Sequence, residues 1–124
     1  MRIRTLLILA SMVLGVMLLG GVALAVNKTC TTNRCGGTNG PDRLIGADGK
    51  NQIYGFAGPD YIDGMAGADK LYGGPGNDRI NASDGYSDDV YCGPGEDTVY
   101  FDLIEDDFPP GSLVNCEHKK EVIT

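Results

Sequence analysis

The sequence predicts an all-β protein, a parallel β-solenoid of the β-roll or β-helix type that is built from nine-residue repeats and preceded by a signal peptide. Three observations lead to this prediction. Glycine recurs at a step of nine residues through the middle of the chain, an aliphatic residue recurs four places after it, and the apolar first 25 residues differ from all that follows. Internal periods of this kind are typical of repeat architectures.

The first segment, residues 1–25, has the features of a signal peptide. Arg2 and Arg4 form a positive start, residues 6–22 are apolar, and residues 23–25 (Ala-Leu-Ala) have the small-x-small pattern that signal peptidases accept. We expect cleavage after this pattern and secretion from a bacterial cell. An uncleaved membrane anchor is the alternative, because the apolar stretch is near the lower length limit of a spanning helix, roughly 17 residues.

The remaining 99 residues are acidic and poor in aliphatic side chains. They contain 17 Asp and Glu against 8 Lys and Arg (the total of 10 less Arg2 and Arg4), and 18 Leu, Ile, Val and Phe against 16 Gly. Such chains usually fail to form an ordinary core. The acidity argues against nucleic acid as a partner and favours cations. We expect no enzymatic activity, because the chain has no HExxH or GxSxG motif and no thiol left over to act with His118.

Four residue types keep one phase through seven copies of the repeat. Each copy starts with a small residue, at Gly37, Gly46, Gly55, Gly64, Gly73, Ala82 and Cys92. The glycine three places later is Gly40, Gly49, Gly58, Gly67, Gly76, Gly85 and Gly95. An acidic or amide residue follows at Asp42, Asn51, Asp60, Asp69, Asp78, Asp88 and Asp97, and an aliphatic residue at Leu44, Ile53, Ile62, Leu71, Ile80, Val90 and Val99. A flexible acidic linker, the alternative for a Gly/Asp-rich stretch, would not preserve this phase.

One copy defines the motif. Residues 73–81, Gly-Gly-Pro-Gly-Asn-Asp-Arg-Ile-Asn, fit GGxGxDxUx at every defined position. On this motif, residues 37–101 resemble the hemolysin-type calcium-binding (RTX) nonapeptide repeat family, and the resemblance implies a parallel β-roll that binds Ca²⁺. The other copies depart mainly at the second glycine, where Thr38, Ala47, Phe56, Met65 and Ser83 stand. Asn51 replaces one aspartate, and residues 82–91 contain one extra residue.

Each copy divides into a Gly-rich turn and a three-residue strand, such as residues 43–45 or 70–72. Only the middle residue of such a strand points inward, because side chains alternate between the two faces. Two copies make one coil of 18 residues, so alternate copies stack. The expected core is a thin double row, with Leu44, Ile62, Ile80 and Val99 on one side and Ile53, Leu71 and Val90 on the other.

Stacking also aligns the acidic residues in two columns. One contains Asp42, Asp60, Asp78 and Asp97, and the other contains Asn51, Asp69 and Asp88. At a coil spacing of about 4.8 Å, neighbouring carboxylates repel by roughly 1 to 3.5 kcal/mol, depending on the effective dielectric. A divalent cation between successive turns reverses the sign of this interaction. We therefore expect the chain to fold when the cation binds.

Calcium suits these gaps better than zinc. Ca²⁺ prefers six to eight oxygen ligands, whereas Zn²⁺ prefers histidine and thiolate. Besides the columns, the predicted ligands are the turn glycines Gly40, Gly58, Gly67, Gly73, Gly76 and Gly95, through their carbonyl oxygens. The two columns contain five gaps and hence up to five sites. We expect the gaps beside Asn51 and beside the inserted residue to be the weakest.

The four cysteines are expected to close the ends of the array. Cys92 occupies the first position of the last copy and Cys116 follows a Pro-Pro-Gly turn, so a bridge between them would fold the tail over the open end of the stack. Cys30 and Cys35 would then close a short loop before the first copy. A pairing that joins the two ends is the alternative. The predicted units are the signal peptide (1–25), the cap segment (26–36), the β-roll (37–101) and the capping tail (102–124).

The leading functional interpretation is a secreted calcium-binding protein. The alternatives are a calcium-rigidified cell-surface adhesion or interaction module with a polymer or protein partner, and an accessory remnant of an RTX hydrolase. Tyr54, Tyr72, Tyr91 and Tyr100 each follow a core aliphatic residue, and we expect them to cover the outer face of the strands rather than to stack on sugars or bases. Asp102 is expected in a solvated acidic loop.

Overall fold

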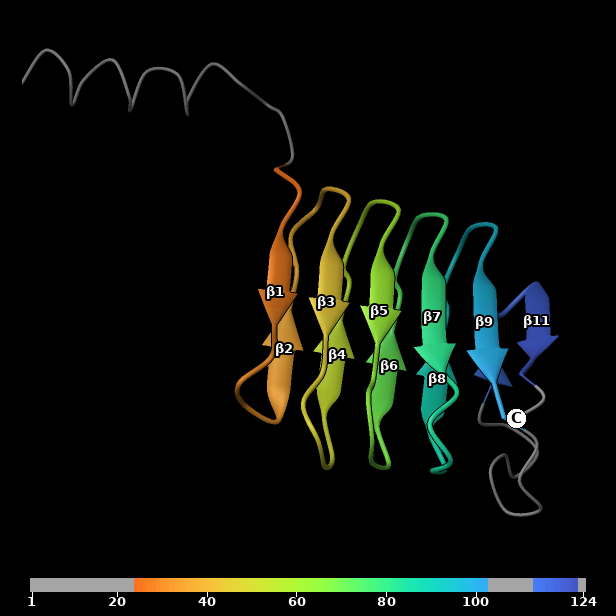
Figure 1. The fold of residues 1–124 in the computed structure, drawn as a ribbon. Coiled ribbons are helices and arrows are strands. Elements are labelled where there is room, and N and C mark those ends of the chain that lie inside the picture. The colour runs from red at the N-terminus through yellow and green to blue at the C-terminus, as the bar shows by residue number, and fades with distance from the viewer. Residues whose placement is uncertain (1–23, 103–112, 123–124) are drawn as a thin grey trace, which may run out of the picture.

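The computed structural model describes residues 24–102 and 113–122, which consist of strands and turns (Figure 1). The predicted signal peptide, apart from its last two residues, lies outside this part of the chain. Within the described residues there is no helix of the length and apolarity needed to cross a membrane.

Eleven short strands form within the described residues. They are β1 (Asn27–Thr29), β2 (Arg34–Gly36), β3 (Arg43–Ile45), β4 (Gln52–Tyr54), β5 (Tyr61–Asp63), β6 (Lys70–Tyr72), β7 (Arg79–Ala82), β8 (Asp89–Tyr91), β9 (Thr98–Phe101), β10 (Leu113–Val114) and β11 (His118–Glu121). The strands of the repeats follow the predicted division of each copy into a turn and a strand.

Odd and even strands form two separate parallel sheets. The first has the order β1-β3-β5-β7-β9-β11, and the second the order β10-β8-β6-β4-β2. Figure 1 shows the odd strands side by side in one layer and the even strands behind them, with turns along both edges. Leu44 pairs with Ile62, and Ile62 pairs with Ile80, at the predicted offset of one coil. The β-solenoid prediction is confirmed.

The core lies between the two sheets and consists of the predicted double row. The middle residue of each repeat strand is fully buried, while its neighbours are half-buried or exposed: Leu44, Ile53, Ile62, Leu71, Ile80, Val90 and Val99 all have 0% exposure. Cys35 continues one row beyond Ile53, because β2 pairs with β4 in the same register. Each coil therefore contributes two large aliphatic side chains.

The second position of the turn often needs a left-handed backbone. Gly74 has a φ of 92°, and a Cβ there would strike the carbonyl oxygen of Phe56 in the preceding coil. Phe56 and Met65 adopt φ values of 71° and 63° at the same repeat position, where a side chain costs roughly 1–2 kcal/mol relative to the right-handed region. Phe56 and Met65 thus adopt this conformation without glycine, whereas Thr38, Ala47 and Ser83 at the same repeat position do not.

The inserted residue lies in a turn and leaves the sheets intact. Asp63 pairs with Asn81 at an offset of 18 residues, whereas Lys70 pairs with Asp89 at an offset of 19. The extra residue is thus absorbed between β7 and β8, and both flanking strands keep their register.

The outer aromatic side chains stack on one another. The ring centroids of Tyr54 and Tyr72 are 4.6 Å apart, and those of Tyr72 and Tyr91 are 4.9 Å apart, with nearly parallel planes. Because these faces cover each other, the three rings form a ladder along the second sheet and are not open platforms for a sugar or a base. This agrees with the expected role of covering the strands.

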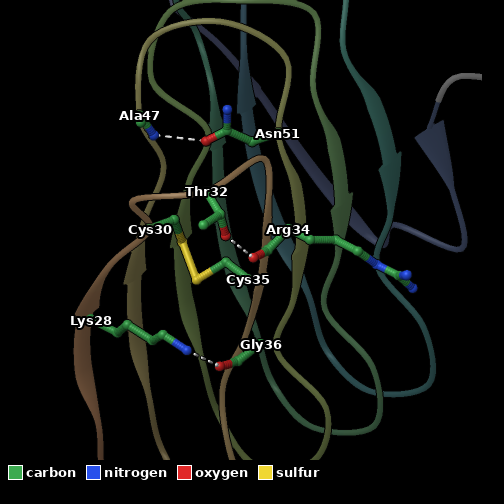
Figure 2. Close-up of a disulfide and its surroundings, with 8 residues drawn as sticks. All are labelled: Lys28, Cys30, Thr32, Arg34, Cys35, Gly36, Ala47 and Asn51. Atoms are coloured by element: carbon green, nitrogen blue, oxygen red, sulfur yellow. Dashed lines mark hydrogen bonds between the residues drawn. A yellow bond between two sulfur atoms is a disulfide. The ribbon is translucent and has the colours of Figure 1, made fainter.

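Both ends carry the predicted disulfides, Cys30–Cys35 and Cys92–Cys116. Figure 2 shows the first bridge, flanked by a hydrogen bond from Lys28 to the carbonyl of Gly36. At the other end, β10 and β11 pair with β8 and β9, so the described part of the tail adds strands to both sheets. The pairing that joins the two ends does not occur.

Candidate metal centre

The first column of carboxylates is buried and interleaved with the backbone. Asp42, Asp60, Asp78 and Asp97 each directly precede an odd-numbered strand, and all four are buried. The N–H of Asp42 donates to Oδ1 of Asp60, that of Asp60 to Oδ1 of Asp78, and that of Asp78 to Oδ1 of Asp97, each at 2.8 Å. Successive carboxylates are therefore joined through a peptide N–H, which offsets part of their repulsion.

Groups outside the repeats extend this column at both ends. The N–H of Val26 donates to Oδ1 of Asp42 at 2.8 Å, and the N–H of Asp97 donates to Oε2 of Glu117 at 3.0 Å. Glu117 was not among the predicted ligands. The repeat pattern breaks there, because Lys119 stands opposite Val99 where an aliphatic residue would be expected. The only sequence signal was an acidic residue two places before that strand position.

The second column has the same arrangement on the opposite edge. Asn51, Asp69 and Asp88 are buried and directly precede even-numbered strands. The N–H of Asn51 donates to Oδ1 of Asp69 at 2.7 Å, and the N–H of Asp69 donates to Oδ1 of Asp88 at 2.8 Å. The structure thus brings together both predicted columns.

Several carboxylates of the two columns retain a buried oxygen without a hydrogen-bond partner in the described part of the chain. They include the Oδ2 atoms of Asp60, Asp69, Asp78 and Asp97. The first three lie against the first glycine of their own turns; a Cβ on Gly55 would be 2.5 Å from Oδ2 of Asp60, and one on Gly64 would be 2.6 Å from Oδ2 of Asp69. A buried, unpaired carboxylate oxygen costs several kcal/mol unless a cation or a proton meets it.

Burial dominates the electrostatics of these groups. It raises the pKa of Asp60 to about 6 and the pKa of Asp69 and Asp78 to about 7, while the N–H donated from the preceding coil opposes the shift. Repulsion from neighbouring aspartates raises these pKa values further, by less than burial does. Burial also raises the pKa of Asp97. The sequence emphasised repulsion within the columns; loss of solvent is the larger contribution, because the side chains point into the coil.

Two column residues are satisfied by the protein itself. Oδ2 of Asp42 accepts hydrogen bonds from the N–H of Thr38 at 2.5 Å and from its hydroxyl at 3.1 Å. Asn51 accepts from the N–H of Ala47 and donates through Nδ2 to the carbonyl of Gly49, both at 2.7 Å (Figure 2 shows the first of these). Neither side chain needs a cation to complete its hydrogen bonding.

Four of the predicted turn glycines, Gly40, Gly58, Gly73 and Gly76, direct their carbonyl oxygens at a glycine of a neighbouring coil. A Cβ on Gly58 would be 2.8 Å from the carbonyl oxygen of Gly40, and a Cβ on Gly55 would be 2.5 Å from that of Gly73. The oxygens of Gly58 and Gly76 face the glycines of the following coils, Gly76 and Gly95, in the same way. Gly67 lies over the carbonyl of Gly49. These oxygens and the carboxylates form the hard donor set that Ca²⁺ prefers, so the residues present fit this ion.

The turn with the inserted residue adds acidic groups that the sequence did not assign. Asp84 is half-buried; burial raises its pKa, and repulsion from Asp102 and Asp63 raises it further. Asp102 is buried, not solvated as expected, because its Oδ2 accepts the N–H of Gly85 at 2.9 Å. The available signal for Asp84 was an aspartate beside the insertion.

Comparison with known proteins identifies the repeats. Residues 36–71 and 54–87 match the family described as RTX calcium-binding nonapeptide repeat (4 copies). No curated protein and no solved structure matches the chain. Repeats of the matched family bind Ca²⁺, which agrees with the donor set of the two columns.

Proposed function

Residues 36–87 belong to the family of RTX calcium-binding nonapeptide repeats, and from this premise we propose that the protein is a secreted calcium-binding β-roll that folds when Ca²⁺ binds. One observation carries the proposal. In three successive copies of the repeat, Asp60, Asp69 and Asp78 present a buried carboxylate oxygen without a hydrogen-bond partner among the described residues. A cation between coils removes the desolvation cost and the repulsion together.

The ligands proposed for these gaps combine side chains and backbone. Carboxylates come from Asp60, Asp69, Asp78, Asp88 and Asp97, and carbonyl oxygens from the turn glycines Gly40, Gly58, Gly67, Gly73, Gly76 and Gly95. The ion supplies positive charge and coordination, while the protein holds the oxygens in register through the parallel strands. Glu117 adds one gap beyond the five expected. The gaps that involve Asp42 and Asn51 bind weakly, because the protein already satisfies those side chains.

Folding is coupled to binding because the core is thin. Each coil buries only two large aliphatic side chains, and the mature chain has the composition of a disordered segment. Binding free energy then becomes folding free energy, as in other small metal-dependent domains. The expected dissociation constant is on the order of 10⁻⁴ to 10⁻³ M, as in extracellular calcium modules, with cooperativity from contacts between neighbouring coils.

Calcium titration of the oxidised mature protein tests this function. Circular dichroism should show little β structure in chelator and a cooperative gain of β signal with Ca²⁺, and a much smaller gain with Mg²⁺, which demands a tighter octahedral geometry. Calorimetry gives the number of ions. A chain that is fully folded in chelator, or unchanged at several millimolar Ca²⁺, would overturn the proposal.

Secretion is proposed on the features of residues 1–25 and on the two disulfides, which form in oxidising compartments. N-terminal sequencing of protein from the culture medium should begin at Val26. Recovery of intact Met1 on membrane-bound protein would replace secretion by anchoring.

A further inference from the structure

The turn that contains the inserted residue brings three carboxylates together. One oxygen each of Asp69, Asp84 and Asp88 lies within 4.8 Å of the other two. Asp69 and Asp88 are column residues on neighbouring coils, whereas Asp84 reaches the same point from the third position of the irregular copy, residues 82–91. Among the described residues, no other set of three acidic, cysteine or histidine side chains meets this spacing.

Unpaired oxygens at this point indicate a ligand. Asp69 is 1% exposed, its Oδ1 accepts the N–H of Asn51, and its Oδ2 has no hydrogen-bond partner in the described part of the chain. Oδ1 of Asp84 accepts the N–H of Tyr86 at 2.9 Å, which leaves its Oδ2 buried and likewise without a described partner. No described residue supplies a hydrogen for either oxygen.

Nearby positive charge does not reach these two oxygens. The ion pairs among the described residues join Lys70 to Asp89 at 3.9 Å and His118 to Glu96 at 3.0 Å. Lys70 follows Asp69 in the chain, but its ammonium group lies on the side of β8. No described ion pair therefore reaches Oδ2 of Asp69 or Oδ2 of Asp84.

We propose that Asp69, Asp84 and Asp88 form a side-chain site for a hard cation such as Ca²⁺, and that this site is the tightest in the array. It rests on the proposed function and deepens it, because it names the gap with the highest affinity. In the other gaps, two carboxylates share the ion with turn carbonyls; here three carboxylates converge, and Ca²⁺ affinity rises with the charge of the ligand set. This order of calcium affinities differs from the expectation from the sequence, which placed the gap beside the inserted residue among the weakest.

The insertion thereby acquires a role. An extra residue lengthens the turn between β7 and β8 and allows Asp84 to approach the column, and the ion then ties that longer turn to the coil of Asp69. The regular copy at residues 64–72 has Ala66 at the third position and cannot supply this ligand.

The repeat offers a matched control for the test. Asp48 occupies the third position of residues 46–54, on the same edge of the roll, but it is exposed, and the column residue of its copy is Asn51 instead of an aspartate. We compare Asp84→Asn and Asp48→Asn in the oxidised mature protein by calorimetric Ca²⁺ titration, with circular dichroism at saturating Ca²⁺ to confirm that both variants fold. Asp84→Asn should lose one ion per chain and weaken the tightest class by roughly tenfold or more; Asp48→Asn should bind like the unsubstituted protein.

The outcomes separate this site from the proposed function as a whole. If Asp84→Asn and Asp48→Asn bind the same number of ions with equal affinities, the site is refuted while binding in the columns stands. If the unsubstituted protein binds a single ion that Asp84→Asn abolishes, this site stands and binding in the other gaps fails. Asp84→Glu, which restores the charge, should regain the lost ion, and failure to do so would contradict coordination through the side chain.

Discussion

The buried Asp or Asn side chain of each repeat is hydrogen-bonded differently in the first coils of the roll and in the coils that follow. In residues 24–54, the side chains of Asp42 and Asn51 have their hydrogen-bonding capacity satisfied by other groups of the protein. In residues 55–102, Asp60, Asp69 and Asp78 retain buried oxygens without a described partner. One fold can therefore satisfy a buried polar group either with its own hydrogen bonds or with an ion, and the choice changes along the stack.

Two substitutions account for the difference. Thr38 stands at the second turn position, where its N–H donates to Oδ2 of Asp42 and its hydroxyl lies within hydrogen-bond distance of both carboxylate oxygens, whereas Phe56 and Met65 at the same position have no hydroxyl. Asn51 carries an N–H₂ group that donates to Gly49, and an aspartate has no hydrogen to give there. We expect the first coils to depend on calcium least.

Calcium removal should have the largest effect on stability, and this effect should differ between the first coils and the later ones. In chelator, amides of residues 55–102 should exchange nearly as fast as in an unfolded chain, while residues 24–54 should retain measurable protection, aided by the Cys30–Cys35 bridge. Hydrogen exchange followed by mass spectrometry measures this. Uniform loss of protection along the chain would contradict the comparison.

Substitution of two aspartates of the same column, Asp78 and Asp42, should change calcium binding and stability to very different extents. Asp78 serves the gaps toward both Asp60 and Asp97 and accepts the N–H of Asp60, so Asp78→Ala should abolish binding in two gaps and remove a hydrogen bond to a charged group worth about 1.5–3 kcal/mol. Asp42→Ala should leave the number of bound ions nearly unchanged, because Asp42 is already satisfied. Calorimetry and thermal unfolding in Ca²⁺ measure both effects; equal losses in the two variants would contradict the difference.

The effect of pH on the metal-free protein should oppose its effect on the calcium-bound protein. The folded pKa values of Asp60, Asp69 and Asp78, about 6 to 7, lie above the unfolded value of 3.8, so the folded state holds more protons between these limits. Metal-free stability is then greatest below about pH 4 and falls until about pH 7. Calcium affinity should rise over the same range as protons leave the ligands. Unfolding curves at pH 4, 5.5 and 7.5, in chelator and in Ca²⁺, check both signs.

Converting Asn51 to aspartate should make the first coils resemble the later ones. Asn51→Asp removes the donor to Gly49 and leaves a buried group unsatisfied, which should destabilise the metal-free form by roughly 1–3 kcal/mol. In Ca²⁺ the new carboxylate should restore the stability and strengthen binding in the gap toward Asp69. A variant equally stable with and without calcium would show that Asn51 does not replace an ion.

Relief of backbone strain at Phe56 should have the smallest effect on the free energy of unfolding. Phe56→Gly should stabilise the calcium-bound protein by roughly 0.5–1 kcal/mol, because Phe56 is half exposed and has a positive φ. Ala47→Gly is the control at the same repeat position, where φ is not positive, and it should destabilise by a similar amount. Thermal unfolding at saturating Ca²⁺ distinguishes the two signs.

Much of the candidate site follows from periodicity. Because coils of constant length stack in register, the spacing between Asp60 and Asp78 already places their side chains one above the other, and the same holds for Ile62 and Ile80. The tail is different, since Lys119 replaces the expected aliphatic residue and only its pairing with Val99 reveals a further strand.

The sequence by itself determined the repeat length, the inward rows and the two acidic columns, because each depends on regular spacing along the chain. It left two pairings of the cysteines open, and the structure decided between them. Only the tertiary structure decided which groups satisfy the hydrogen-bonding capacity of each carboxylate. Whether Thr38 reaches Asp42, whether Asp84 approaches Asp69 and whether Asp102 is buried depend on the path of individual turns, and an inserted residue changes that path without leaving a periodic signal. Buried polar groups depend on atoms within about 3 Å, a scale that residue spacing alone does not specify.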